Sequence, residues 1–127
     1  MRFPDKLDVL IVHARLIEET GGSVGIRDEA LLASALDAVV NRYNLADADL
    51  VACAATYAYH LTQAHAFIDG NKRIAAAVAE TFLESNGSQL AITDEEMVRL
   101  FLDIAAGLLS RDEVERFLRP KIRPVER

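Results

Sequence analysis

The stretch LVACAATYAYHLTQAHAFIDGNKRIAAAVAETFLESNG (residues 50–87) decides the fold. It contains two alanine-rich apolar runs, which a short break at Phe67–Gly70 separates. The first run, from Leu50 to His65, carries apolar side chains on most sides, which is typical of a helix at the centre of a bundle. The second run, from about Asn71 to Ser85, predicts another buried helix, stopped by Asn86-Gly87. We therefore expect two neighbouring helices at the centre of the molecule.

Apolar residues at helical spacing also precede this centre. They predict a helix from about Pro4 to Glu19, and the glycine-rich segment GGSVGIR (residues 21–27) is expected to end it and form a shaped loop. Asp28 is the expected N-cap of the next helix, and Asn41–Ala46 a polar connection before Asp47 opens the central run. The apolar face of the first helix is expected to consist of Leu7, Leu10, Ile11, Ala14 and Ile17, and that of the second of Leu31, Leu32, Ala35, Leu36 and Val39.

Shorter elements are predicted after the centre. Gln89–Ile92 is expected to be a short extended piece. The patterns TDEE (residues 93–96) and SRDE (residues 110–113) are capping boxes, and each predicts the start of a helix. The polar tail from about residue 119 is expected to fray. Residues 1–127 are therefore predicted to form one compact, all-α helical bundle.

The composition excludes several classes of protein. The 127 residues are 51% hydrophobic and 27% charged, which is typical of a globular protein and not of a disordered one. The formal net charge of −6 argues against direct binding of nucleic acid, because phosphate contacts need a basic face. We find no signal peptide and no run near the roughly 20 apolar residues of a membrane span. Cys53 is the only cysteine and is expected in the core. These features predict a cytoplasmic protein without a membrane partner.

The segment HAFIDGNKR (residues 65–73) has the composition of a binding site. Gly70 and Asn71 can adopt the backbone angles that aim successive N–H groups at one point, which creates an anion site at a helix N-terminus. Lys72 and Arg73 bring two cations to the same helix end, where each is disfavoured by about 0.3–1 kcal/mol unless an anion offsets it. The pattern indicates a phosphate site, and the alternative is the solvated turn that an isolated G-N-K-R forms in most proteins.

Other residues of the segment add chemistry. Asp69 suits magnesium, which prefers carboxylate and phosphate oxygens. His65 is the natural proton acceptor for a hydroxyl nucleophile, and Phe67 is expected to anchor the loop in the core. His13 and His60 lie in apolar helical patterns without a carboxylate or cysteine placed to share a metal. We expect a structural or partner-contacting role for both.

The motif closely resembles the H-x-F-x-(D/E)-(A/G)-N-K-R signature of the Doc (death-on-curing) proteins of the Fic superfamily. GGSVGIRDEALLASAL (residues 21–36) is similar to the glycine-rich and RD-x-x-LL-x-SAL segment of Doc chains. AAAVAETFLESNG (residues 75–87) is similar to the helix that follows their motif. The resemblance covers roughly Leu7 to Leu118, and the chain length is that of a stand-alone Doc toxin.

The resemblance implies a small all-α Fic fold that uses ATP and Mg²⁺ to modify a hydroxyl group of another protein. In Doc toxins this reaction is the phosphorylation of elongation factor Tu, which arrests translation. His65 would be the general base, and Gly70 and Asn71 would form the anion hole. The implied catalytic residues are His65, Asn71 and Arg73, the nucleotide-binding residues are Gly70, Asn71, Lys72 and Arg73, and the metal ligand is Asp69.

Two positions depart from the H-x-F-x-(D/E)-G-N-G-R-x-x-R pattern of adenylylating Fic proteins. Lys72 stands in place of the glycine, and Ala76 in place of the second arginine. Both changes resemble the Doc branch, in which the nucleotide is thought to bind reversed and to present its γ-phosphate. Gly70 stands where some Doc chains have alanine, an exchange that we expect to matter little. The inhibitory (S/T)-x-x-x-E-(G/N) motif of many Fic proteins is absent, as expected where an antitoxin inhibits in trans.

Three functions are compared on this basis. The leading hypothesis is a phosphotransferase toxin of a toxin–antitoxin pair. A Fic-type protein adenylyltransferase would transfer AMP instead, and a catalytically silent protein would only bind. For the toxin, the resemblance implies an antitoxin with a disordered tail that folds into a helix on binding. The expected groove lies between Leu10, His13 and Ile17 of the first helix and the glycine-rich loop.

Overall fold

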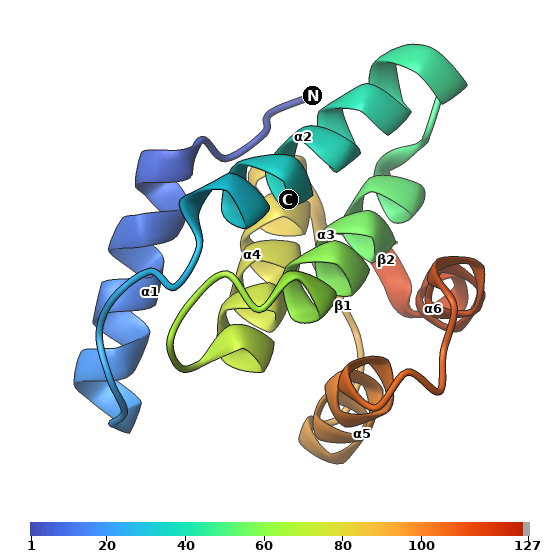
Figure 1. Cartoon of the computed structure of the whole chain (residues 1–127). Helices are drawn as coiled ribbons and strands as arrows, with labels where there is room; N and C mark the ends of the chain where they lie inside the picture. Colours follow the sequence, from blue (N-terminus) through green and yellow to red (C-terminus); the bar gives the residue numbers. More distant parts are fainter. Residues whose placement is uncertain (126–127) are drawn as a thin grey trace.

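The structure, a computed structural model that describes residues 1–125, is a bundle of helices with one small sheet (Figure 1). The all-α prediction is confirmed, and the small sheet pairs β1 with β2 antiparallel. In chain order the elements are α1 (Lys6–Thr20), α2 (Glu29–Ala46), α3 (Leu50–Ala64), α4 (Asn71–Ser85), β1 (Ser88–Leu90), α5 (Asp94–Ala105), α6 (Arg111–Leu118), the 3₁₀ turn η1 (Arg119–Lys121) and β2 (Ile122–Pro124).

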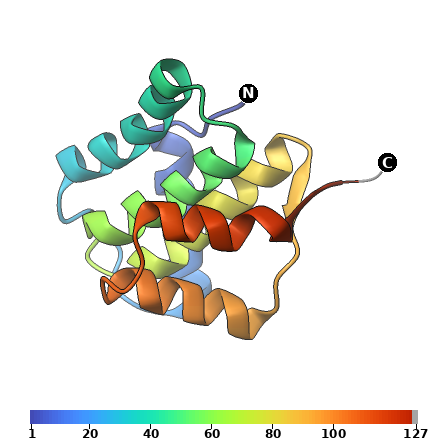
Figure 2. The ribbon, with the colours of Figure 1, turned by 90° about the vertical axis from the view of Figure 1, so that its right-hand side faces the viewer.

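Helices α3 and α4 form the centre of the bundle, as predicted. α3 packs against α2, α4, α5 and α6, and every side chain from Ala52 to Ala58 is buried. Cys53 lies in the core, where burial raises the pKa of its thiol to about 11. Figure 2 shows α5 and α6 covering one face of the central pair. Asp49, and not Asp47, caps α3: its side chain accepts a hydrogen bond from the backbone N–H of Ala52.

The predicted apolar face of α1 is wrong in its rotation. The buried residues are Val9, His13 and Ile17, whereas Leu7 is 62% exposed and Ile11 44% exposed. The prediction placed Leu7 and Ile11 in the apolar face and did not include His13. In the structure His13 belongs to the buried stripe, because its ring has partners in the interior. Of the three α1 residues expected to line the antitoxin groove, His13 and Ile17 are buried within the chain and Leu10 is half buried.

The predicted polar connection at residues 41–46 is also wrong, because α2 continues through it. Arg42 donates hydrogen bonds to Oγ1 of Thr56 (3.0 Å) and to the carbonyl of Ala52 (3.2 Å) on α3. Tyr43 packs edge-on against Phe3, with ring centroids 5.3 Å apart. Arg42 and Tyr43 therefore hold one side of this helical segment against the core, while Asn41, Asn44 and Leu45 are exposed. The helix ends at Asp47, in the left-handed conformation (φ 51°).

The C-terminal part confirms the two capping boxes, at the starts of α5 and α6. The extended piece predicted at Gln89–Ile92 is present as β1, which begins one residue earlier and ends two residues earlier, at Ser88–Leu90. The expected fraying from residue 119 is wrong over the described residues. β2 pairs with β1 in the register Ser88↔Pro124, and residues 126 and 127 lie outside the described part.

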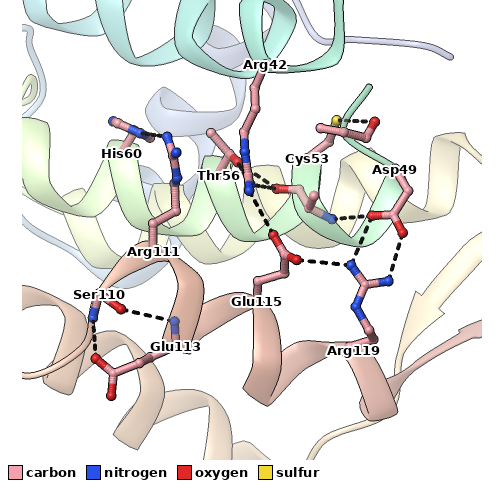
Figure 3. Close-up of polar contacts among 12 residues, drawn as sticks. Arg42, Asp49, Cys53, Thr56, His60, Ser110, Arg111, Glu113, Glu115 and Arg119 are labelled. Atoms are coloured by element: carbon pink, nitrogen blue, oxygen red, sulfur yellow. Dashed lines mark hydrogen bonds and ion pairs between the residues drawn. The ribbon is translucent and has the colours of Figure 1, made fainter. Parts of the chain in front are cut away.

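An ion network also holds this region against the core (Figure 3). Arg119 forms ion pairs with Asp49 (2.7 Å) and with Glu115 (3.1 Å). Glu115 also pairs with Arg42 of α2 at 3.1 Å. Because Asp49 is the N-cap of α3, the network joins three helices. In the described part of the chain, none of the helices is long and apolar enough to cross a membrane.

Candidate active site

The end of α3 places His65 at the surface. His65 is the C-cap of α3 in a left-handed backbone conformation (φ 48°, ψ 43°), which among the described non-glycine residues only Asp47 shares. Its carbonyl accepts a 2.7 Å hydrogen bond from Nε of Arg27. A cation at the C-terminus of a helix is electrostatically favourable. The residue is exposed, so its imidazole is accessible to a hydroxyl group of another molecule.

The glycine-rich segment after α1 lies along the loop that begins at His65 (Figure 1). Ile26 forms an antiparallel bridge with Phe67. The backbone N–H groups of Arg27 and Asp28 both donate to the carbonyl of Ala66, at 2.8 and 3.0 Å. Two separate segments of the chain therefore shape one loop, a pairing that the sequence did not predict.

Phe67 anchors the loop in the core, as predicted, and is only 2% exposed. Its ring stacks on that of His13, with centroids 3.8 Å apart and an interplanar angle of 16°. Nε2 of His13 also lies 2.7 Å from the carbonyl oxygen of Asp69. The structural role expected for His13 is confirmed. The sequence analysis did not predict its contact with the motif. His13 lies one helical turn from both Val9 and Ile17, and this spacing could have placed it on the buried face of α1.

The side chain of Asn71 holds the loop closed. Its Oδ1 accepts from the backbone N–H of Phe67, and its Nδ2 donates to the carbonyl of the same residue, both at 3.0 Å. The side-chain amide is therefore engaged within the protein. The contribution of Asn71 to an anion site rests on its backbone N–H, at the first position of α4.

Gly70 is the N-cap of α4, with a φ of 76° that side chains rarely adopt. A Cβ at this position would lie 3.1 Å from Cδ1 of Ile17 and 3.6 Å from Nε2 of His13. The expected tolerance of alanine is therefore not supported for this chain. No side chain of the described residues caps α4, so its first N–H groups point toward the space in front of the helix.

The carboxylate of Asp69 lies between α4 and the glycine-rich segment. Its Oδ1 accepts from the backbone N–H of Gly70 (2.8 Å), and its Oδ2 from that of Ser23 (3.3 Å). A guanidinium nitrogen of Arg73 is 3.6 Å from Oδ1. A Cβ on Gly22 would be only 2.5 Å from Oδ2, so this glycine is needed for the close approach.

The two cations of the motif differ in their contacts. Arg73 donates to Oγ1 of Thr20 and to the carbonyl of Gly21 (3.0 Å), at the C-terminal end of α1. These two hydrogen bonds and the carboxylate of Asp69 account for the charge of Arg73 without a bound ligand anion. Lys72 is exposed and forms no ion pair with the described residues. The argument from cations in the first helical turn therefore applies to Lys72 alone.

A comparison with known protein families matches the part of the chain that carries this loop. The model of the Fic/DOC family matches residues 3–83, which contain α1, α2, α3, the motif loop and all but the last two residues of α4. The chain belongs to the Fic/DOC family. A search of the curated proteins returned no match. Fic/DOC proteins typically transfer nucleotide or phosphate groups to proteins, using a nucleoside triphosphate and a metal ion.

The residues of this Fic/DOC site fit such a metal ion. The side chain of Asp69 is 48% exposed, and a carboxylate has more lone pairs than its present donors use. The described residues contain no cluster of three or more metal-ligating side chains. A single carboxylate suits a magnesium ion, which takes its other ligands from phosphate oxygens and water.

An apolar pocket of about 220 Å³ adjoins the motif helix of this Fic/DOC protein. Lys72, Arg73 and Ala76 line it from α4, and four residues line it from α5: Met97, Val98, Phe101 and Leu102. Two of these, Val98 and Leu102, are exposed. Ala76 therefore places a small, uncharged side chain at the wall of an apolar pocket.

His60 is not part of the motif loop. Its Nε2 lies 3.2 Å from NH1 of Arg111 on α6, and it is half buried. Burial, followed by the charge of Arg111, lowers the pKa of His60. This contact between α3 and α6 is consistent with the structural or partner-contacting role predicted for this histidine.

Proposed function

We propose that this Fic/DOC protein is a Doc-type toxin that phosphorylates a hydroxyl group of another protein. The reaction uses ATP and Mg²⁺ in the cytoplasm, and the proposed target is elongation factor Tu, whose modification arrests translation. One observation carries the proposal. An exposed histidine and the uncapped N-terminus of a helix stand at the two ends of one anchored loop. A proton acceptor and a phosphate-binding helix end are the two parts that phosphoryl transfer to a hydroxyl needs.

His65 is the proposed general base. The hydroxyl oxygen of the target attacks the γ-phosphorus of ATP while His65 takes the hydroxyl proton. A new oxygen–phosphorus bond forms, the bond to the β-phosphate oxygen breaks, and ADP leaves with that electron pair. The left-handed backbone of His65 and its contact with Arg27 support this role, because they hold the residue at the helix end and out of the core.

The start of α4 is the proposed phosphate site. The first backbone N–H groups of this helix and its positive dipole end favour the charge that develops on the transferred group. Lys72 adds an exposed positive charge, and Arg73 can bind phosphate oxygens with two parallel hydrogen bonds. For that, its guanidinium must turn away from Thr20 and Gly21. Asp69 would hold Mg²⁺, which supplies positive charge to the phosphates.

The environment of residue 76 favours phosphate transfer over AMP transfer. Ala76 lines an apolar pocket and carries no charge that would draw the terminal phosphates away from the start of α4. Lys72 instead concentrates positive charge near the helix end, which favours the more highly charged γ-end of ATP. Adenylyl transfer and silent binding remain the outcomes that oppose the proposal.

The proposed partner in the cell is an antitoxin with a disordered tail that folds on binding. Such a tail needs apolar surface on the toxin. Leu7 and Ile11 offer it on the outer side of α1, because both are exposed. The inner side of that helix is not available, since His13 and Ile17 are buried.

The test is a transfer reaction with a bacterial lysate and ATP labelled on either the α- or the γ-phosphate. We expect only the γ-label on a target, and a mass increase of about 80 Da as opposed to about 329 Da for AMP. The His65→Ala variant should transfer no label, and His60→Ala, which removes a histidine outside the loop, should transfer it normally. An α-label on the target would show adenylyl transfer, and no label from wild type would favour silent binding.

A further inference from the structure

His13 is the only polar side chain among the buried residues of α1. It lies between Val9 and Ile17 on the inner face of the helix and is 2% exposed. Burying a polar group is costly unless it is hydrogen-bonded. His13 meets this condition through one contact outside its own helix, with the carbonyl of Asp69 in the motif loop, 56 residues away in sequence.

The direction of this hydrogen bond follows from its partner. A carbonyl oxygen can only accept, so Nε2 of His13 carries the hydrogen and donates it over 2.7 Å. The ring cannot easily turn away, because it stacks on Phe67 at 3.8 Å. The donor is therefore held in position by an aromatic contact with the same loop.

The hydrogen bond from His13 fixes the orientation of the peptide unit between Asp69 and Gly70. The carbonyl of Asp69 and the N–H of Gly70 belong to one planar peptide unit, so holding the carbonyl also sets the direction of the N–H. That N–H donates to Oδ1 of Asp69 at 2.8 Å. A continuous path of hydrogen bonds thus runs from His13, through this peptide, to the carboxylate. Gly70 otherwise has an unusually free backbone, which makes an external restraint on its peptide effective.

We propose that His13 is a positioning residue that aims the carboxylate of Asp69 through the Asp69–Gly70 peptide. The inference rests on the proposed function in one respect, the role of Asp69 as the metal ligand. His13 does not touch the metal or the nucleotide. It sets the orientation of the Asp69 carboxylate, which does. Residues that hydrogen-bond to metal ligands generally orient them in this way.

Three variants separate the donor from the ring. His13→Gln retains an N–H donor near the place of Nε2 but loses the ring. His13→Phe retains the ring stacked on Phe67 but loses the donor, and His13→Met is a second donorless variant that adapts to the same space. Thermal melting identifies the variants that fold, and all measurements use the full chain.

Two measurements report on the peptide and on the metal. Hydrogen exchange of the Gly70 amide is followed by NMR, with the amide of Ala54 in α3 as an internal reference. Binding of Mn²⁺ in the presence of ATP is followed by electron paramagnetic resonance. In His13→Phe we expect Gly70 to exchange about tenfold faster and the half-saturating Mn²⁺ concentration to rise about tenfold. His13→Gln should remain within about twofold of wild type in both.

The outcomes are distinguishable. Wild-type values for both measurements in folded His13→Phe or His13→Met would overturn the proposal. So would a folded His13→Gln that is as impaired as His13→Phe, because the ring and not the donor would then matter. If wild type takes up no Mn²⁺, the metal role of Asp69 in the proposed function fails, and Gly70 exchange still decides whether His13 orients the peptide.

Discussion

Two polar clusters of this Fic/DOC protein differ in how completely their charges are matched. In the network of Arg42, Glu115, Arg119 and Asp49, every ion pair is between 2.7 and 3.1 Å. In the motif loop, Asp69 and Arg73 are 3.6 Å apart. Lys72 has no ion-pair partner among the described residues, and the start of α4 has no side-chain cap there.

The difference separates a structural cluster from a site. The network joins α2, α3 and α6, and its charges satisfy one another (Figure 3). The motif loop has its backbone tightly bonded but leaves charges and N–H groups available to a ligand. Four predictions test this contrast, and each alters one cluster while the other remains intact.

The largest effect is expected from His65. Replacing it by alanine removes the proposed base and should lower the transfer rate by about 10²–10⁴. The free energy of unfolding should fall by no more than about 1 kcal/mol, because the residue is exposed but its left-handed backbone suits histidine better than alanine. His65→Asn is the matched control, since asparagine tolerates the left-handed backbone but is no base. Transfer at the wild-type rate by either folded variant would assign the base elsewhere.

Gly22→Ala should disturb the carboxylate directly. Its Cβ would lie 2.5 Å from Oδ2 of Asp69, and the φ of 115° disfavours any side chain. We expect transfer to fall about tenfold or more. Gly87→Ala is the control: its φ is 81°, but the described residues leave open space around its Cβ. Urea unfolding should show a loss of roughly 1–3 kcal/mol from the backbone in both, and only Gly22→Ala should lose activity.

Glu115→Ala should show the opposite behaviour. Arg42 and Glu115 are only 20% and 22% exposed, so the variant leaves a partly buried guanidinium without its carboxylate. We expect a loss of about 1–2 kcal/mol in the free energy of unfolding, measured with urea. The transfer rate per folded molecule should not change. A large loss of activity at full stability would mean that the network contributes to the site.

The smallest effect concerns pH. The hydrogen bonds from Arg119, followed by that from the backbone of Ala52, hold the pKa of Asp49 below its ordinary value of 3.8. The ionised form therefore stabilises the fold above that pH, and this contribution disappears as the pH falls through the lowered value. Arg119→Gln should cost about 0.5 kcal/mol near neutral pH, because solvent screens the pair. Urea unfolding at low pH should show a smaller difference, and an equal difference would contradict the assignment.

The parts of the fold that were predicted correctly from the sequence are those that local sequence patterns determine. Capping boxes lie within four residues, and the helical spacing of α3 and α4 is visible within one segment. The predictions are wrong where contacts with residues distant in the sequence determine the secondary structure. Residues 41–46 are helical because of partners on α3, and residues 122–124 form a strand because β1 is available.

The site follows the same rule. The motif residues were predictable, because they are contiguous and chemically ordered. The residues that hold them, His13 and Arg27, come from other parts of the chain and touch backbone carbonyls, which leave no pattern in the sequence. Arg73 was predicted as a phosphate ligand, and its contacts at the end of α1 could only be seen in three dimensions.

The ion pair between Arg119 and the N-cap of α3 also has a consequence for the order of synthesis. The ribosome delivers the motif well before it delivers α6 and Arg119, and domains are generally completed only when their last packed element is made. A nascent chain that displays residues 65–73 therefore has α3 without the helix and the cation that brace its start. Products of interrupted translation that stop before residue 119 would carry the whole motif on an unsupported scaffold. The motif loop therefore gains its final surroundings only after Arg119 has been made, later in synthesis than the motif itself.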